Sequence, residues 1–162
     1  MIGAVTVRPA RPEDVGSLIG MIRDLATYER EPDAVETDEL MLADALFCDS
    51  PTVFAHVAEV EAQVVGMAVW FVTFSTWTGR SGLYLEDLYV RPGVRHSGVG
   101  RALLAALAAL AAERGCARID WSVLDWNESA LGFYRSLGAR PMDGWTSYRL
   151  DGDRLGRVAR EG

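Results

Sequence analysis

A strand, a loop with two glycines and a long helix follow one another between residues 83 and 114, and this order strongly constrains the fold. Residues 83–90 (LYLEDLYV) are rich in the apolar and aromatic side chains typical of a strand. Residues 98–114 repeat leucine at the spacing of one helix face. Because such a helix returns the chain along a sheet, we predict that the next strand lies parallel to residues 83–90.

The other hydrophobic patterns predict further strands and helices, in the mixed order that defines an α/β fold. The predicted strands cover residues 2–8, 52–60, 63–74, 83–90, 117–124 and 145–150. The predicted helices begin at Pro12, at a cap formed by Thr37, at Gly98 and at Asn127, and residues 75–82 are predicted to form a loop. The strands of the first half are expected to pair as antiparallel hairpins. The last dozen residues are polar and are expected to fray.

Length and composition indicate one domain over residues 1–162 and argue against several classes of partner. The longest apolar run, residues 102–112, is shorter than the roughly 20 residues that a bilayer requires. The first residues show no secretory pattern, so we expect a cytoplasmic protein without a membrane partner. The net charge of −7 argues against nucleic-acid binding and favours a small cationic ligand.

The loop RHSGVG, residues 95–100, ends at the start of a helix and predicts an anion site. Backbone N–H groups at a helix N-terminus have no intrahelical acceptors, and the helix dipole favours negative charge there. Gly98 and Gly100 allow a bulky phosphate to approach the backbone, and Arg95 and Arg101 add positive charge. The alternative interpretation is a glycine-rich turn that binds nothing.

Two common phosphate-binding motifs do not match this loop. A nucleoside-triphosphate loop requires Gly-Lys-Ser/Thr, whereas this chain has Gly100, Arg101 and Ala102. A dinucleotide-binding fingerprint requires a third glycine where Leu103 stands. The bound phosphate is therefore expected to belong to another kind of ligand.

Neither the cysteines nor the histidines form a recognisable metal or nucleophile motif. Cys48 and Cys116 lack partners at zinc-ligand spacing, so we expect reduced, small hydrophobic residues and no metal. His56 lies in a predicted strand and is interpreted as structural. His96 lies in the glycine loop, where it could border bound phosphates.

The chain resembles the GNAT superfamily of acetyl-coenzyme A-dependent N-acetyltransferases. Its signature, Gln/Arg-x-x-Gly-x-Gly/Ala, is matched by Arg95, Gly98 and Gly100. The resemblance extends to the spermidine/spermine (diamine) acetyltransferase branch, from about Arg8 to about Leu155, in the stretches RPARPED, LATYE, VVGMAVWFVTF, TWTG, LYLEDLYV, RHSGVGRALL, LDWNESALGFYRSLGA and DGWTSYRLD. It implies the acyl-coenzyme A N-acyltransferase fold, a mixed and mostly antiparallel sheet that splays at a central parallel strand pair and is flanked by helices.

The resemblance implies acetyl-coenzyme A as the acetyl donor and coenzyme A as a product. In the family, the strand before the loop pairs with the pantetheine arm, and the loop amides bind the pyrophosphate. The implied cofactor-binding residues are Leu88, Tyr89, Val90, Arg95, His96, Ser97, Gly98, Val99, Gly100, Arg101, Asn127 and Tyr134. For Asn127, a helix N-cap is an independent alternative role.

The resemblance also implies direct transfer with two catalytic residues. Tyr134 would donate a proton or a hydrogen bond to the departing thiolate, which is feasible because a thiol pKa near 8.5 and a phenol pKa of about 10 are not far apart. Glu86 would accept the proton of the amine, directly or through water. The alternative roles are an aromatic core residue for Tyr134 and a solvated acid for Glu86.

The residues that match the family's amine pocket are Tyr28, Glu29, Trp77, Glu86, Asp87 and Trp145. Acids and aromatic rings suit an alkyl-ammonium chain through charge pairing and cation–π contact. Glu86 and Asp87 are adjacent on a strand, so their side chains should point to opposite faces, and only one should face the substrate. Solvated acids and core tryptophans are the alternatives for the other residues.

One departure from the family pattern bears on the substrate. Many diamine enzymes carry Asp-Pro-Trp in the loop where this chain has Ser75, Thr76 and Trp77, so one partner for a second ammonium group is lost. A diamine or polyamine, a mono-amine, an amino-acid side chain and a thialysine-like substrate all remain open. A non-catalytic acyl-coenzyme A sensor and a protein N-terminal or lysine acetyltransferase are alternative functions. Resemblance to the family also implies a homodimer.

Overall fold

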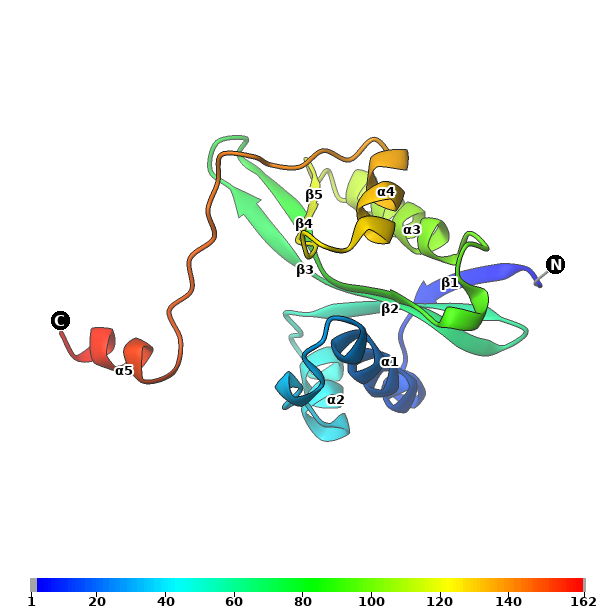
Figure 1. The fold of residues 1–162 in the computed structure, drawn as a ribbon, viewed down its shortest axis with the longest axis horizontal. Coiled ribbons are helices and arrows are strands. Elements are labelled where there is room, and N and C mark those ends of the chain that lie inside the picture. Colours follow the sequence, from blue (N-terminus) through cyan, green and yellow to red (C-terminus); the bar gives the residue numbers. More distant parts are fainter. Residues whose placement is uncertain (1–2, 162) are drawn as a thin grey trace. The chain divides into compact units, whose positions relative to one another are not determined.

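The computed structural model describes residues 3–161, which divide into two compact units, residues 3–124 and residues 125–161. The first unit is built on a five-stranded sheet in the order β1-β2-β3-β4-β5 (Figure 1). Its strands are β1 Val5–Pro9, β2 Phe54–Val60, β3 Gln63–Ser75, β4 Arg80–Val90 and β5 Ile119–Trp121. The first four pair antiparallel, whereas β4 and β5 pair parallel. The predicted mixed α/β sheet with one parallel pair is therefore confirmed.

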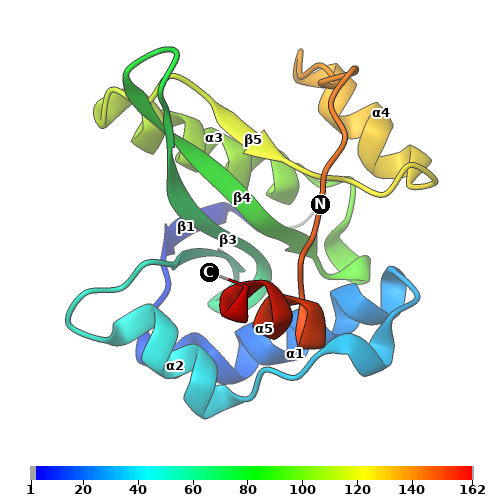
Figure 2. The same cartoon turned by 90° about the vertical axis from the view of Figure 1, so that its left-hand side faces the viewer.

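Helices cover both faces of this sheet. They are α1 Val15–Tyr28, α2 Glu39–Phe47 and α3 Val99–Glu113, with short 3-10 turns at Pro12–Asp14, Pro32–Ala34 and Pro92–Val94. Helices α1 and α2 lie on one face and α3 lies on the other (Figures 1 and 2). Helix α3 joins β4 to the parallel strand β5, as the leucine pattern predicts.

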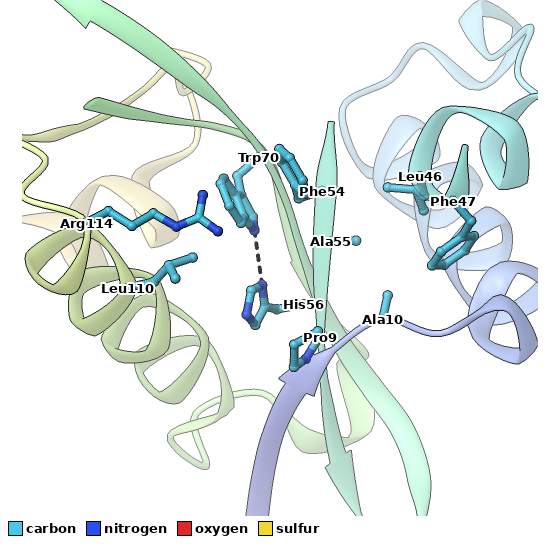
Figure 3. Close-up of a pocket in the computed structure, with 10 residues that line it drawn as sticks. All are labelled: Pro9, Ala10, Leu46, Phe47, Phe54, Ala55, His56, Trp70, Leu110 and Arg114. Atoms are coloured by element: carbon cyan, nitrogen blue, oxygen red, sulfur yellow. Dashed lines mark hydrogen bonds between the residues drawn. The ribbon is translucent and has the colours of Figure 1, made fainter. Parts of the chain in front are cut away.

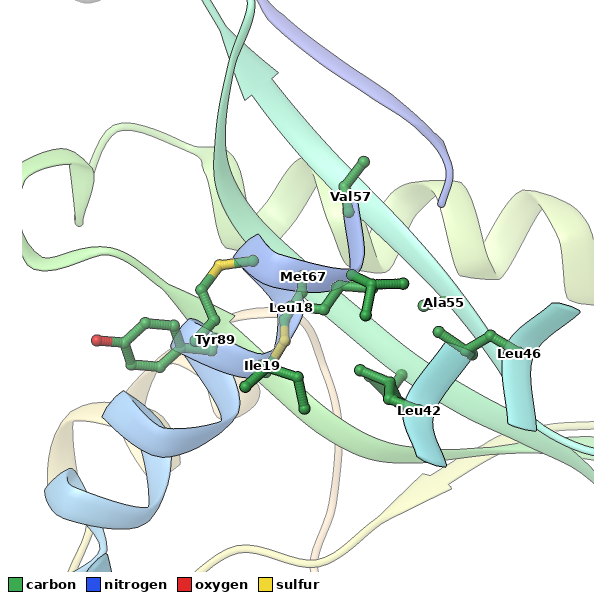
Figure 4. Close-up of a cluster of buried hydrophobic side chains, with 11 residues drawn as sticks. Leu18, Ile19, Leu42, Leu46, Ala55, Val57, Met67 and Tyr89 are labelled. Atoms are coloured by element: carbon green, nitrogen blue, oxygen red, sulfur yellow. The ribbon is translucent and has the colours of Figure 1, made fainter. Parts of the chain in front are cut away.

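The main apolar core lies between the sheet and the helices α1 and α2 (Figure 4). The helices contribute leucine and isoleucine side chains, and the sheet contributes Val57, Met67 and Tyr89. Leu18 and Met21 are completely buried. Full burial of such side chains stabilises the fold by about 1.5–3 kcal/mol each, so this core fixes the first half of α1 against Tyr89, near the end of β4.

The pairing of β3 with β4 contains a β-bulge at Glu86. Val69 lies opposite Asp87 and Trp70 lies opposite Leu85, so Glu86 has no directly opposed residue on β3. Asp87 therefore shares a face with Val69, which packs in the core beside α1 and α2. A bulge re-aims the side chains on either side of it, and here it turns Asp87 towards α1 while Glu86 is exposed.

Several predicted boundaries are wrong. Asp38, not Thr37, caps α2, because its carboxylate accepts a hydrogen bond from the Met41 amide at 2.8 Å. The predicted loop over residues 75–82 is only a tight turn, because Arg80 pairs with Ser75 and extends the hairpin. The strand expected over residues 117–124 is shorter, since β5 pairs with β4 over three residues only. Residue 2 of the first predicted strand lies outside the described residues.

The second unit contains two helices, α4 Glu128–Ser136 and α5 Gly152–Arg160. The helix predicted from Asn127 to Leu137 is confirmed, and Gly138, the residue predicted to end it, adopts a φ of 81°. The strand predicted over residues 145–150 is wrong, because no strand pairs with this segment among residues 3–161. The tail expected to fray instead forms α5. The single domain over residues 1–162 remains a prediction.

Candidate active site

The loop between β4 and α3 exposes the N-terminus of α3. Gly98 is the N-cap residue and has a φ of 90°, in the left-handed region that glycine adopts without strain. The first helical hydrogen bond runs from the Ala102 amide to the Gly98 carbonyl, at 2.9 Å. The amides of Val99 and Gly100 precede it, and no side chain caps them. This arrangement fits the predicted anion site, because the helix dipole adds to the two N–H groups.

The remaining loop residues hold the turn in shape. The Ser97 hydroxyl donates a hydrogen bond to the Val94 carbonyl. His96 adopts a φ of 63°, which is unusual for a residue other than glycine. This contact and this backbone conformation orient the start of α3. The direct phosphate contacts expected of His96 and Ser97 stay predictions.

Arg95 connects this loop to Tyr28, one of the residues predicted to line the amine pocket. Its Nε donates a hydrogen bond to the Val90 carbonyl at 3.0 Å. Its guanidinium carbon lies 5.2 Å from the Tyr28 ring centroid and 5.5 Å from that of Tyr89. Cation–π contacts of this kind stabilise by about 0.5–1 kcal/mol when exposed. Arg95 thus joins the end of α1 to the end of β4, while its predicted phosphate contact stays a prediction.

Two carboxylates predicted to bind substrate lie close enough to interact. Glu29 follows the last turn of α1, and Asp87 lies on the face of β4 that packs towards α1. Reduced hydration raises the pKa of Glu29. Burial, followed by the charges of Glu86 and Glu29, raises the pKa of Asp87 to about 6. A cationic substrate would relieve this repulsion, so the group Tyr28, Glu29 and Asp87 suits an ammonium ion.

The structure does not bring every predicted pocket residue into this group. Trp77 lies in the turn between β3 and β4 and is 89% exposed. At about 3.3 Å of rise per residue, Asp87 lies about 23 Å along β4 from Arg80, at the other end of the strand. Within one chain, Trp77 is therefore remote from Asp87.

Three predicted site residues belong to the second unit, namely Asn127, Tyr134 and Trp145. The Asn127 side chain accepts a hydrogen bond from the Ala130 amide at 3.2 Å, so Asn127 is the N-cap of α4. Tyr134 lies in α4, and its ring centroid is 5.4 Å from that of Phe133. Trp145 is 74% exposed in the segment between α4 and α5. Their predicted roles in cofactor and substrate binding stay predictions.

Sequence patterns do not indicate the cavity that lies beside Leu110 and Arg114, at the C-terminal end of α3 (Figure 3). It is a cavity of about 300 Å³, lined by Pro9, Ala10, Leu46, Phe47, Phe54, Ala55, His56, Trp70, Leu110 and Arg114. The Trp70 indole donates a hydrogen bond to Nδ1 of His56 at 3.0 Å. Burial, and secondly the charge of Arg114, lowers the pKa of His56. These contacts support the structural role expected of His56.

Other reactive groups do not form a site. Both cysteines are free, and Cys48, the C-cap residue of α2, is exposed. Within residues 3–161, no cluster of three His, Cys, Asp or Glu side chains could hold a metal ion. In the same residues, no helix has the length and apolar character of a membrane span.

The structure thus has a mixed sheet with one parallel strand pair, and a glycine loop and a long helix connect the two strands of that pair. Residues 7–139 match the family described as "Acetyltransferase (GNAT) family", and the chain belongs to this family. It is therefore an acetyltransferase, in agreement with the resemblance found in the sequence.

Individual relatives extend this similarity over nearly the whole chain. The chain is 37% identical over 169 residues to the thialysine N-epsilon-acetyltransferase of Sus scrofa, which covers 98% of this chain and 99% of that protein. It is 31% identical to spermidine/spermine N(1)-acetyltransferase-like protein 1 of Homo sapiens, over 92% of this chain and 23% of that protein. An integron cassette protein from the mobile metagenome of V. cholerae has a similar structure, with a TM-score of 0.80 and 28% identity over 96% of this chain and 98% of that one.

Proposed function

We propose that the protein is an N-acetyltransferase that transfers acetyl from acetyl-coenzyme A to a primary amine of a small cationic substrate. The observation that carries this proposal is the acidic and aromatic group formed by Tyr28 and Glu29 at the end of α1 and Asp87 on β4, in an acetyltransferase fold. Similarity to thialysine N-epsilon-acetyltransferases over 98% of the chain supports the same class of acceptor.

The residues around the glycine loop fit the binding of acetyl-coenzyme A, which supplies an activated acetyl thioester when bound. Gly98 leaves open space where a side chain would stand, since no atom beyond its chain neighbours lies within 4 Å of the position that a Cβ would occupy. The amides of Val99 and Gly100 would hold the diphosphate, with charge from Arg101. The backbone of residues 88–90 would position the pantetheine arm.

Two proton transfers must accompany the reaction. An amine is mostly protonated near neutral pH and cannot attack until it loses a proton. A carboxylate on the bulged part of β4 would accept that proton, and the resemblance assigns this role to Glu86. Tyr134 would donate a proton to the departing sulfur. Neither role requires a metal.

Substrates with one ammonium group near the acetylated nitrogen fit the chain better than polyamines do. Ser75 stands where diamine enzymes often carry an acid, and the neighbouring Trp77 is remote from Asp87 within one chain. We therefore propose a thialysine-like or amino-acid side-chain amine as the preferred acceptor. Asn127 and Trp145 complete the proposed cofactor and amine contacts.

We also propose that the protein is a cytoplasmic homodimer. The two free cysteines are typical of a reducing compartment. Trp77, Trp145 and Tyr148 are 89%, 74% and 94% exposed, and exposed aromatic side chains of this size often mark protein interfaces. Size-exclusion chromatography with light scattering distinguishes a dimer from a monomer.

The function is tested by following free-thiol release from acetyl-coenzyme A with purified protein. The acceptors are thialysine, lysine, putrescine, spermidine and a basic peptide, and Tyr134→Phe is the comparison variant. Turnover on a small amine that falls by about 10²–10⁴-fold in the variant supports the proposal. Tight cofactor binding without turnover would instead indicate a sensor, and turnover on the peptide alone a protein acetyltransferase.

A further inference from the structure

We propose that the cavity at the C-terminal end of α3 is a second ligand-binding site, which takes a small aromatic monocarboxylate (Figure 3). This site goes beyond the proposed acetyl transfer, which uses the opposite end of the same helix. Val99 is the first residue of α3 and Arg114 is its C-cap residue. At about 1.5 Å of rise per residue, the two lie about 22 Å apart, so a ligand that fills the cavity does not reach the glycine loop.

The cavity lies where the edge strand β1 leaves the sheet. Pro9 is the last residue of β1 and pairs with His56 on β2. The Ala10 amide donates one more hydrogen bond to the Ala55 carbonyl, at 2.9 Å. Within residues 3–161, Phe54 at the start of β2 has no β1 residue opposite it. The ends of α2 and α3 contribute the remaining walls, so the cavity is a consequence of the strand lengths.

The walls of the cavity are mainly apolar, and contacts hold them in place. The Phe54 ring stacks on Trp70, with 4.7 Å between the ring centroids. Trp70 is 1% exposed, and its indole N–H is bonded to His56. Phe47, the last residue of α2, adds a third aromatic ring. The volume of about 300 Å³ lies at the lower end of the range for small-molecule pockets, and a flat aromatic body suits such walls.

The charge at this cavity is positive, although the chain has a net charge of −7. The lining residues include Arg114 but no Asp or Glu. In the part of the chain that the structure describes, Arg114 forms no ion pair, and its guanidinium carbon lies 5.3 Å from the Trp70 ring centroid. Its planar fork of N–H groups matches the two oxygens of a carboxylate. The cavity therefore favours an anionic ligand.

His56 supplies a second hydrogen-bond donor. Its Nδ1 accepts the bond from the Trp70 indole, so the hydrogen of the neutral ring is on Nε2. Burial, and secondly the charge of Arg114, lowers the pKa of His56 and keeps the ring neutral near pH 7. Among the described residues, no acceptor pairs with this Nε2 and no buried side-chain nitrogen lacks a partner, so Nε2–H is accessible to a ligand or to water.

These two donors match a carboxylate better than a phosphate. One guanidinium balances one negative charge, and the neutral imidazole adds a hydrogen bond without a second charge. A phosphate dianion would keep an unbalanced charge in a mainly apolar cavity, which is unfavourable. The aromatic walls and the single cation thus define the ligand class.

The test is calorimetric titration of the full chain with 2-naphthoate, and 2-naphthamide serves as an uncharged probe of similar shape. We expect saturable binding of naphthoate to one site and binding of the amide that is weaker by at least about tenfold. Arg114→Met keeps an unbranched side chain but loses the charge, so it should weaken naphthoate binding by about 10–100-fold and leave amide binding nearly unchanged. Arg114→Lys should keep part of the affinity. Arg23→Met, at an exposed position of α1, is the matched control and should bind naphthoate as the wild type does.

Two further measurements locate the ligand. The NMR signal of the Trp70 indole N–H, identified with Trp70→Phe, should shift on addition of naphthoate, whereas the indole signals of Trp77 and Trp145 should not. Saturation with coenzyme A should leave the affinity for naphthoate unchanged. Neither measurement depends on acetyl transfer, so the proposed function can fail while this site stands. Absence of saturable binding, displacement of naphthoate by coenzyme A, or full affinity in Arg114→Met would overturn the proposal.

Discussion

Replacing Asp87 by asparagine should stabilise the folded protein at neutral pH. The pKa of Asp87 rises from 3.8 to about 6 on folding, because the carboxylate is buried near Glu86 and Glu29. At 1.36 kcal/mol per pKa unit, this corresponds to about 3 kcal/mol of destabilisation by the charged form. A free energy of this size is a large share of the total for a domain of ordinary stability.

The direction in which the unfolding free energy changes with pH follows from proton linkage. The folded chain binds the Asp87 proton more tightly than the unfolded chain, so the unfolding free energy falls as pH rises between about 3.8 and 6. The destabilisation by the charged Asp87 carboxylate is absent below about pH 3.8 and fully present above about pH 6. Asparagine carries no charge, so Asp87→Asn should match the wild type near pH 4 and exceed it by up to about 3 kcal/mol near pH 7.5.

The assay is urea unfolding of both proteins at these two pH values, followed by circular dichroism. The exposed substitution Asp24→Asn serves as the matched control and should show no difference that depends on pH. An Asp87→Asn protein that is less stable at pH 7.5, or whose difference from the wild type is the same at both pH values, would refute the claim that burial and neighbouring charges raise the pKa of Asp87.

Three further substitutions test other parts of the structure. Asp14→Asn should destabilise the protein by about 3–5 kcal/mol at pH 7, because it breaks a buried ion pair with Arg8. This destabilisation should become smaller in acid, once the pH falls below the lowered pKa of Asp14, and urea unfolding at several pH values measures the destabilisation and its pH dependence. Gly98→Ala should cost about 1–2 kcal/mol through its φ of 90° and weaken acetyl-coenzyme A binding, as measured by calorimetry. Gly66→Ala should destabilise by about 1–3 kcal/mol in thermal unfolding, because a Cβ would stand 3.0 Å from a Val99 methyl group, while binding at Gly98 should persist.

Features that depend on local pattern could be predicted from the sequence. The hairpin of β2 and β3 follows from alternating side chains, and α3 follows from its leucine spacing and the glycine before it. Sequence alone does not decide the N-cap of α2, because Thr37 and Asp38 are both good N-cap residues and only the hydrogen bond from the Met41 amide identifies Asp38.

Features that depend on distant contacts could not be predicted in this way. The bulge at Glu86 arises from the register of β4 against β3, which alternation within β4 does not encode. The approach of Glu29 to Asp87 brings together a helix end and a strand far apart in the chain, through the core between them. The segment 145–150 has the composition of a strand, but a strand forms only where a neighbour supplies its hydrogen bonds.

The most direct test of the proposed function is mass spectrometry of the acceptor after incubation with the protein and acetyl-coenzyme A. Thialysine, spermidine and a basic peptide are offered together at equal concentration, so that they compete for one active site. We expect thialysine to gain one acetyl group first and the peptide to remain unmodified. Acetylation of the peptide alone, or no acetylated product while acetyl-coenzyme A stays bound, would contradict the proposed function.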